Sequence, residues 1–151
     1  MLRDSINNAV KEAMKAKDER KLSTLRMVNS TIKNADIAAR GEGKPSLSDA
    51  DLLGVLQKMI KQRQEAILLY EKGGRPELAA AERAEIAVIS AYLPKQMSEE
   101  DVKAAISAAI AETGAAGIKD MGKVIGALKA KYTGQMDFAK ASALVKSALG
   151  G

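Results

Sequence analysis

Apolar residues recur at the spacing of an α-helix along almost the whole chain, and no stretch alternates apolar and polar residues as a half-buried strand does. The first stripe consists of Leu2, Ile6, Val10 and Met14, the second covers residues 22–35, and five more follow. A chain with only helical periodicity buries its apolar faces by packing helix against helix. The sequence therefore predicts an all-α fold.

Two runs that contain glycine and proline are expected to end the early helices, at residues 40–45 and 73–76. The longest helix is expected between them, over about residues 49–72. Its start is indicated by Ser48 with Asp51 three residues later, the spacing of a capping box with Asp in place of the usual Glu.

A third proline indicates a domain boundary. Residues 93–96, Leu-Pro-Lys-Gln, interrupt the helical pattern, and Ser98 followed by three acidic residues predicts the next helix start. We therefore expect an N-terminal helical bundle of about four helices over residues 1–94 and a small three-helix C-terminal domain over residues 98–151.

The chain contains no Cys and no His. Disulfides, thiolate nucleophiles and Cys/His zinc sites are excluded, and so is imidazole, the usual proton shuttle near neutral pH. The carboxylates are dispersed, and neither a phosphate-cradling glycine loop nor a nucleophile elbow is present. We expect no catalytic residues, no cofactor and no metal.

Membrane and export signals are also missing from the sequence. No apolar run is long enough to span a bilayer, and the first twenty or so residues lack the apolar core of a signal peptide. The expected location is therefore cytoplasmic, without a membrane partner.

The formal net charge is +5, and the positive charge is concentrated near the two ends of the chain. Residues 113–151 hold six Lys against two Asp, and residues 1–34 hold eight basic against four acidic side chains. Such segments are compatible with a polyanionic partner. Because aromatic residues make up only 3%, contact with phosphates and shape is favoured over stacking on unpaired bases.

The stretch 119–131 carries the strongest indication of function. Gly122 and Gly126 lie one turn apart on the same helix face, although a glycine inside a helix costs about 1 kcal/mol relative to alanine. Two interpretations explain them: a neighbouring helix packs closely there, or an RNA backbone sits on the bare strip between Lys123 and Lys129.

The turn that follows the sixth predicted helix adds polar groups beside it. Gly134 is expected to reverse the chain and Asp137 to cap the last helix, which is the plainer interpretation. The turn also presents side chains that suit a phosphate. The complete set of candidate RNA-binding residues is Lys119, Gly122, Lys123, Gly126, Lys129, Lys131, Thr133 and Gln135.

A secondary basic face is predicted in the N-terminal part, on the second and third helices. It consists of Arg26, Lys33, Lys61 and Arg63. Most clusters of this kind are solvated surface, and Glu82 and Glu85 could instead form ion pairs with Arg63 or Arg75.

Several motifs in order along the chain resemble the YqeY-like family of small bacterial proteins. They are Leu25-Arg26-Met27, Ile32-Lys33-Asn34-Ala35, Ile60-Lys61-Gln62-Arg63, Tyr70-Glu71-Lys72-Gly73-Gly74-Arg75, Glu85-Ile86, Tyr92-Leu93-Pro94-Lys95-Gln96 and Asp120-Met121-Gly122-Lys123-Val124-Ile125-Gly126.

The final third also resembles the tail domain of the GatB component of the glutamine-dependent tRNA amidotransferase. That resemblance implies contact with the tRNA body. It does not imply amidotransferase activity, because the domains that handle ATP, Mg²⁺ and ammonia have no counterpart in this sequence.

Three hypotheses about function remain. The leading one is a non-catalytic tRNA-binding accessory protein, associated with a tRNA-charging or amidotransferase complex, whose binding weakens with salt. The second is a helical protein–protein adaptor with an exposed apolar patch around Ile67, Leu68 and Tyr70. The third is a carbon–nitrogen ligase activity with glutamine as amido-N-donor, which predicts a pocket of converging carboxylates and lysine.

Overall fold

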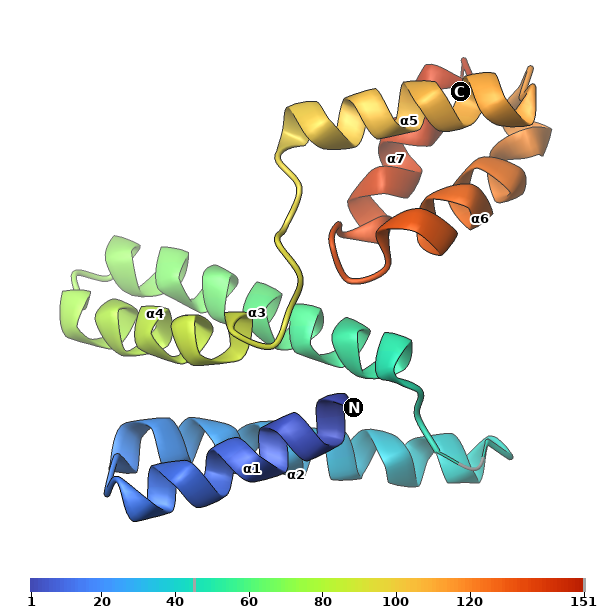
Figure 1. Cartoon of the computed structure of the whole chain (residues 1–151). Coiled ribbons are helices and arrows are strands. Elements are labelled where there is room, and N and C mark those ends of the chain that lie inside the picture. Colours follow the sequence, from blue (N-terminus) through green and yellow to red (C-terminus); the bar gives the residue numbers. More distant parts are fainter. Residues whose placement is uncertain (45, 151) are drawn as a thin grey trace. The chain divides into compact units, whose positions relative to one another are not determined.

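The computed structural model describes residues 1–44 and 46–150 of the chain, which form seven α-helices, one 3₁₀ turn and no strand (Figure 1). The predicted all-α fold is confirmed. The described residues divide into two compact units, Met1–Pro94 and Lys95–Gly151. Pro45 of the first predicted loop lies outside the described residues, as does Gly151 at the end of the predicted C-terminal domain.

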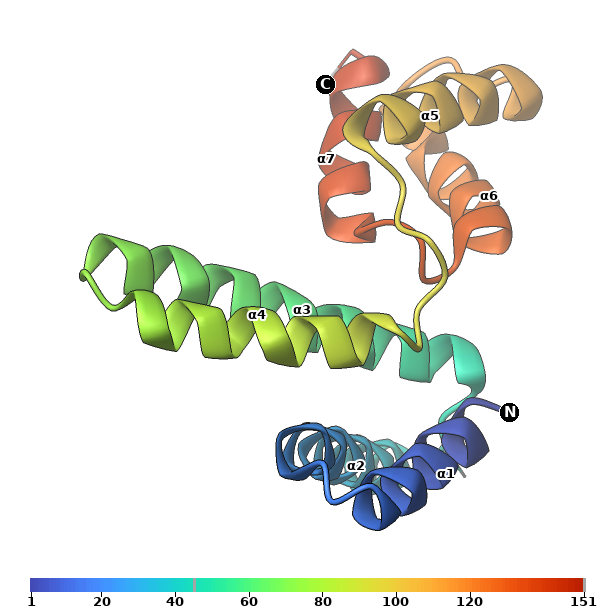
Figure 2. The same cartoon turned by 60° about the vertical axis from the view of Figure 1, so that its left-hand side comes forward.

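The N-terminal unit contains four helices: α1 (Leu2–Lys15), α2 (Glu19–Gly41), α3 (Asp49–Lys72) and α4 (Pro76–Ser90). α1 lies along α2, and α3 and α4 form an antiparallel hairpin (Figures 1 and 2). α2 contacts both helices of that hairpin, so all four share one apolar core. The fully buried side chains of that core include Ile6, Leu25, Val28, Leu52, Leu56 and Ile89.

The apolar stripe predicted for the first helix is only partly correct. Ile6 is fully buried, but Met14 is 53% exposed, and the helix buries Ala9 and Ala13 instead. Positions four residues apart advance by about 40° beyond a full turn each time, so a stripe built only on that spacing drifts off the buried face. The steps from Ile6 to Ala9 and from Ala9 to Ala13 alternate three and four residues and stay on it.

The predicted helix start at Ser48 is confirmed as a reciprocal capping box. The Asp51 N–H donates to the Ser48 hydroxyl, and the Ser48 N–H donates to the Asp51 carboxylate. Pro76 differs from expectation, because it is the first residue of α4 and not part of the turn. Its fixed φ suits a first helical position, where the missing N–H is not needed.

Lys17 joins α1 to α2 in a left-handed conformation, with φ 55°. The Lys17 N–H donates to the Met14 carbonyl and the Asp18 N–H to that of Ala13, the pair of bonds that defines a Schellman motif. Asp18 then caps α2 by accepting the N–H of Lys21. Two helices are thereby connected by three residues, one of them in a backbone region that favours glycine.

The C-terminal unit packs α5 (Glu99–Thr113), α6 (Met121–Tyr132) and α7 (Phe138–Ala148) around a separate core, with the 3₁₀ turn η1 (Ile118–Asp120) leading into α6. A second capping box, between Ser98 and Asp101, starts α5. The core of the C-terminal unit includes Ala105, Ile106, Ala109, Val124, Leu128, Met136, Ala141 and Val145.

The segment before α5 is anchored within this unit. The Met97 N–H donates to the Gln135 carbonyl at 2.9 Å, and Gln96 Nε2 donates to the Gly134 carbonyl at 2.6 Å. Both acceptors lie in the turn between α6 and α7. The start of α5 is therefore fixed by contacts inside the C-terminal unit.

Candidate nucleic-acid interface

The burial of α6 decides which of its faces is free. Val124 and Leu128 are almost completely buried, and Met121, Ile125 and Tyr132 are partly buried and pack against the same core. Since successive residues turn by about 100°, the opposite side of the helix must face outward. Gly122 and Gly126 lie there and are exposed.

Space is open above both glycines. A Cβ atom built on Gly122 or Gly126 meets nothing within 4 Å in the described part of the chain. The plainer sequence interpretation, that a neighbouring helix packs against the pair, therefore does not hold within the described residues. The backbone of α6 is bare over one turn, and the cost of two glycines is not offset by packing inside the unit.

Two of the predicted lysines, Lys123 and Lys129, lie on α6 with the glycines, and Lys119 lies in the η1 turn that precedes it. Lys119, Lys123 and Lys129 are exposed, and none of them forms an ion pair with another described residue. Lys129 Nζ lies 6.0 Å from the centroid of the Phe138 ring on α7, at the outer limit of a cation–π contact. Sequence reasoning missed Phe138, whose place directly after the cap residue Asp137 was its only signal.

The other predicted residues of the C-terminal unit are engaged internally. Lys131 Nζ pairs with Glu112 on α5 at 3.0 Å, and that hydrogen bond raises the pKa of Lys131. The Thr133 hydroxyl donates to the Lys129 carbonyl. Gln135 is half-buried; its N–H donates to the Tyr132 carbonyl, and its carbonyl accepts the Met97 N–H. We use the name glycine strip for the exposed remainder: Lys119, Gly122, Lys123, Gly126 and Lys129.

The secondary basic face is not assembled as predicted, because Arg63 points inward. Its side chain is only 12% exposed, and Nε lies 2.9 Å from Glu85 and 3.9 Å from Glu82, both on α4. Nη1 donates to the Met59 carbonyl and Nη2 to the sulfur of Met27, at 2.9 Å each. The predicted pairing of Arg63 with these glutamates is confirmed, whereas Arg75 pairs with its neighbour Glu77.

Burial also affects the carboxylates around Arg63. Desolvation is the main cause that raises the pKa of Glu82, and repulsion by Glu85 raises it further, although the nearby Arg63 guanidinium acts in the opposite direction. Arg63 thus ties α2, α3 and α4 together and is not available to a partner. Arg26 and Lys33 on α2 and Lys61 on α3 are exposed.

The apolar patch of the adaptor hypothesis is partly present. Leu68 and Leu69 on α3 are 63% and 70% exposed, whereas Ile67 is buried and Tyr70 is half-buried.

Among the described residues, no group of three or more acidic side chains is arranged to hold a metal ion. None of the described helices has the length and apolar character needed to cross a bilayer.

Curated yeast proteins are similar to this chain. Altered inheritance of mitochondria protein 41, mitochondrial, from Vanderwaltozyma polyspora is 39% identical over 84 residues, which cover 56% of this chain and 44% of that protein. The protein of the same name from Lachancea thermotolerans is 34% identical over 114 residues, 72% of this chain and 59% of that protein. The chain spans about half the length of the curated relatives it matches.

These relatives contradict the cytoplasmic location expected from the sequence, since they are named as mitochondrial proteins. That expectation was wrong because it rested on missing signals, and the absence of a signal peptide or bilayer span does not specify a compartment. The pattern of the Yqey-like protein family matches residues 3–149, nearly the entire chain. The chain therefore belongs to the Yqey-like protein family.

Proposed function

We propose that this chain is a non-catalytic RNA-binding protein that contacts the body of tRNA through the glycine strip of α6. The observation that carries the proposal is the open space above Gly122 and Gly126, flanked by exposed lysines that form no ion pair with other described residues. The resemblance of the final third to the tail of the tRNA amidotransferase supports tRNA as the RNA. A tRNA-charging or amidotransferase complex is the assembly in which such an accessory protein would act.

The chemistry of the strip suits a sugar-phosphate backbone. Lysine supplies a point charge to a phosphate without reading the base, and bare glycines let a backbone approach the helix axis more closely than a side chain would allow. The chain has only four aromatic side chains, and one of them, Phe138, already contacts the Lys129 ammonium. A folded, helical part of the RNA fits this surface better than splayed single-stranded bases.

Binding of bulk tRNA at two salt concentrations tests the proposal. Three phosphate contacts predict a logarithmic salt slope of about −2 to −3. The variant Lys123→Glu/Lys129→Glu should lose binding. A matched double variant, Lys58→Glu/Lys103→Glu, changes the net charge equally on exposed positions outside the strip and should retain most of it. Equal loss in both variants, or no tRNA binding by the wild type, would contradict the site.

The exposed leucines favour a second candidate function, docking of a partner protein on α3. Leu68 and Leu69 lie side by side in sequence near the end of the α3–α4 hairpin and are mostly exposed. This adaptor function predicts salt-tolerant binding that Leu68→Asp/Leu69→Asp abolishes and that Lys123→Glu/Lys129→Glu leaves intact. The ligase hypothesis predicts turnover of glutamine that requires ATP and Mg²⁺, which a direct assay of ammonia release would detect.

A further inference from the structure

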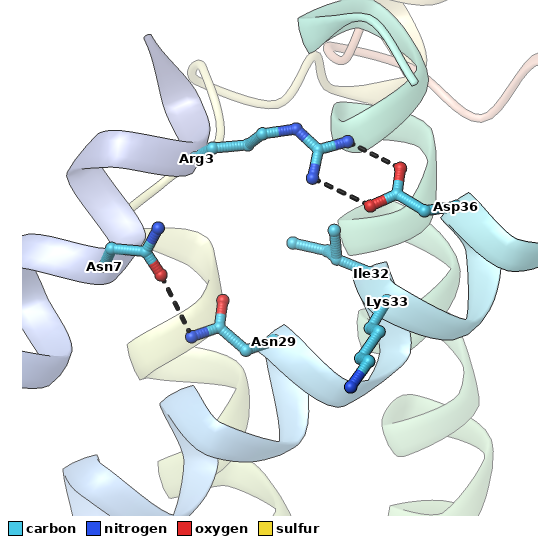
Figure 3. A pocket seen from close by; sticks show the side chains of 6 residues that line it. All are labelled: Arg3, Asn7, Asn29, Ile32, Lys33 and Asp36. Carbon is cyan, nitrogen blue, oxygen red and sulfur yellow. Dashed lines mark hydrogen bonds and ion pairs between the residues drawn. The ribbon is translucent and has the colours of Figure 1, made fainter. Parts of the chain in front are cut away.

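A surface hollow between α1 and α2 has its polar groups paired within the chain. Arg3 forms two hydrogen bonds with the Asp36 carboxylate, at 2.6 and 2.9 Å, and Asn29 Nδ2 donates to Asn7 Oδ1 at 3.4 Å. Figure 3 shows the Lys33 ammonium pointing away from these groups. The described lining residues therefore turn no uncompensated charge toward this space, and their bonds hold α1 against α2.

Two charges near the end of α3 differ from those of the hollow, because they are not paired within the unit. Glu71, at the side of this helix, forms an ion pair with Arg83 on α4. Glu65 and Lys72 are exposed, and neither forms an ion pair with another described residue. One acidic and one basic side chain on the same helix are thus both available to a partner.

These two charges share one face of α3 with the exposed leucines. At about 100° per residue, Glu65, Leu68, Leu69 and Lys72 lie within about 50° of a single direction. That direction is opposite to the side of α3 that holds its buried residues. We use the name outer face for these four residues, because they point away from the core of the N-terminal unit.

The outer face is its own complement under a two-fold rotation. Glu65 and Lys72 lie at equal distances on either side of the leucine pair, about 5 Å along the helix from its midpoint. A two-fold axis that crosses α3 between Leu68 and Leu69 brings a second copy alongside in antiparallel orientation. Each leucine then meets its own counterpart, and Glu65 of each copy meets Lys72 of the partner subunit. This match of shape and charge favours a second copy over an unrelated protein.

From this symmetry we infer that the outer face of α3 binds a second copy of this chain in an antiparallel pair. The inference rests on the docking function proposed for α3 and names its partner. Because α3 ends at Lys72, only residues 65–72 of each helix overlap, whereas a stable interface has about 20–30 residues a side. We therefore expect weak association, with a Kd between about 10 µM and about 1 mM.

Sedimentation equilibrium of the full chain over this concentration range tests the inference. The weight-average mass should rise with concentration from that of the monomer toward that of the dimer. Leu68→Asp/Leu69→Asp should remain monomeric, because it brings aspartates of both copies together at the axis. Lys103→Glu, an exposed position on α5, is the control for a charge change outside the outer face and should associate as the wild type does.

Charge reversal supplies a test that a merely unfolded variant would not pass. Glu65→Lys and Lys72→Glu each place like charges opposite one another at both symmetric contacts, so each alone should weaken association about tenfold. An equimolar mixture of the two variants should associate at least as well as the wild type. In the mixed pair, two positive side chains of one copy meet two negative side chains of the other.

Three results would overturn the inference: a wild type that stays monomeric up to about 1 mM, association that survives Leu68→Asp/Leu69→Asp, or a mixture that associates no better than its components. Failure of the docking function itself has a different signature. If the wild type stays monomeric while another protein binds it only when Leu68 and Leu69 are intact, the docking function stands and the second copy is excluded as its partner.

Discussion

Replacement of Gly126 by alanine should stabilise the C-terminal unit. Gly126 lies inside α6, five residues after its start, and nothing lies within 4 Å of the Cβ that alanine would add. The expected gain is therefore the full difference in helix propensity, about 1 kcal/mol. For Gly122, the second residue of the helix, we expect roughly half of that gain, because the first turn is less constrained.

Native-state hydrogen exchange at the amides of Val124 and Leu128 measures this gain directly, because both residues lie in the core of the same unit. A gain of about 1 kcal/mol should slow their exchange about fivefold. Ala130→Gly, at an exposed position of the same helix, is the matched control and should accelerate exchange by a similar factor. Faster or unchanged exchange in Gly126→Ala would refute the argument, since it would mean that the strip is covered in solution.

The same substitution should weaken tRNA binding if the glycines serve for close approach of a backbone. We expect a modest loss for Gly126→Ala and a loss of roughly tenfold or more for Gly126→Leu, whose side chain occupies the space that a partner would fill. Ala130→Gly should bind tRNA normally. A variant that is more stable yet binds more weakly separates a functional glycine from a structural one, whereas normal binding by Gly126→Leu would exclude the strip as the contact.

Three further predictions concern the N-terminal unit and can be measured by urea unfolding. Lys17→Gly should stabilise it by about 1 kcal/mol, because its left-handed φ of 55° strains a residue with a side chain. Arg63→Ala should cost about 2–4 kcal/mol, since it leaves two half-buried carboxylates unpaired, whereas Arg75→Ala at an exposed pair should cost under about 1 kcal/mol. The hydrogen bond from Arg3 lowers the pKa of Asp36, so this pair stabilises the fold above about pH 4 and the effect disappears as the pH falls further. Asp36→Asn should therefore lose less stability than the wild type between about pH 5 and about pH 3.

Features set by a few neighbouring residues were predictable from the sequence. Both serine caps, at Ser48 and Ser98, start helices at the expected positions, and the predicted Asp137 cap accepts the N–H of Ala139. Gly114 ends α5 in the left-handed conformation that glycine permits. Each of these depends on backbone groups within about four residues, so no knowledge of the tertiary packing is needed.

Features that depend on the angle between helices were not predictable. Lys131 meets Glu112 across nineteen positions of sequence. Lysine is usually solvated, so composition alone favoured an exposed, RNA-facing role for Lys131. For Arg63 the sequence offered both an exposed basic face and a pairing with Glu82 and Glu85, and only the packing of α3 against α4 decides for the pairing. The choice between the two interpretations of Gly126, a packed neighbouring helix or an open strip, also depends on tertiary packing. Only the placement of α5 and α7 shows whether a neighbour occupies the space beside this glycine.

The contacts that precede α5 have a consequence for the modularity of the chain. The capping box of Ser98 and Asp101 closes within four residues, and Gln96 and Met97 are held by the α6–α7 turn. A segment that begins at Gln96 thus carries the capping box and both contacts to the α6–α7 turn, so we expect its first helix to start unchanged when it follows an unrelated polypeptide. A junction placed only two residues later would remove both anchors. The N-terminal limit of a transferable C-terminal unit is therefore set by Gln96 and Met97, which lie outside any helix.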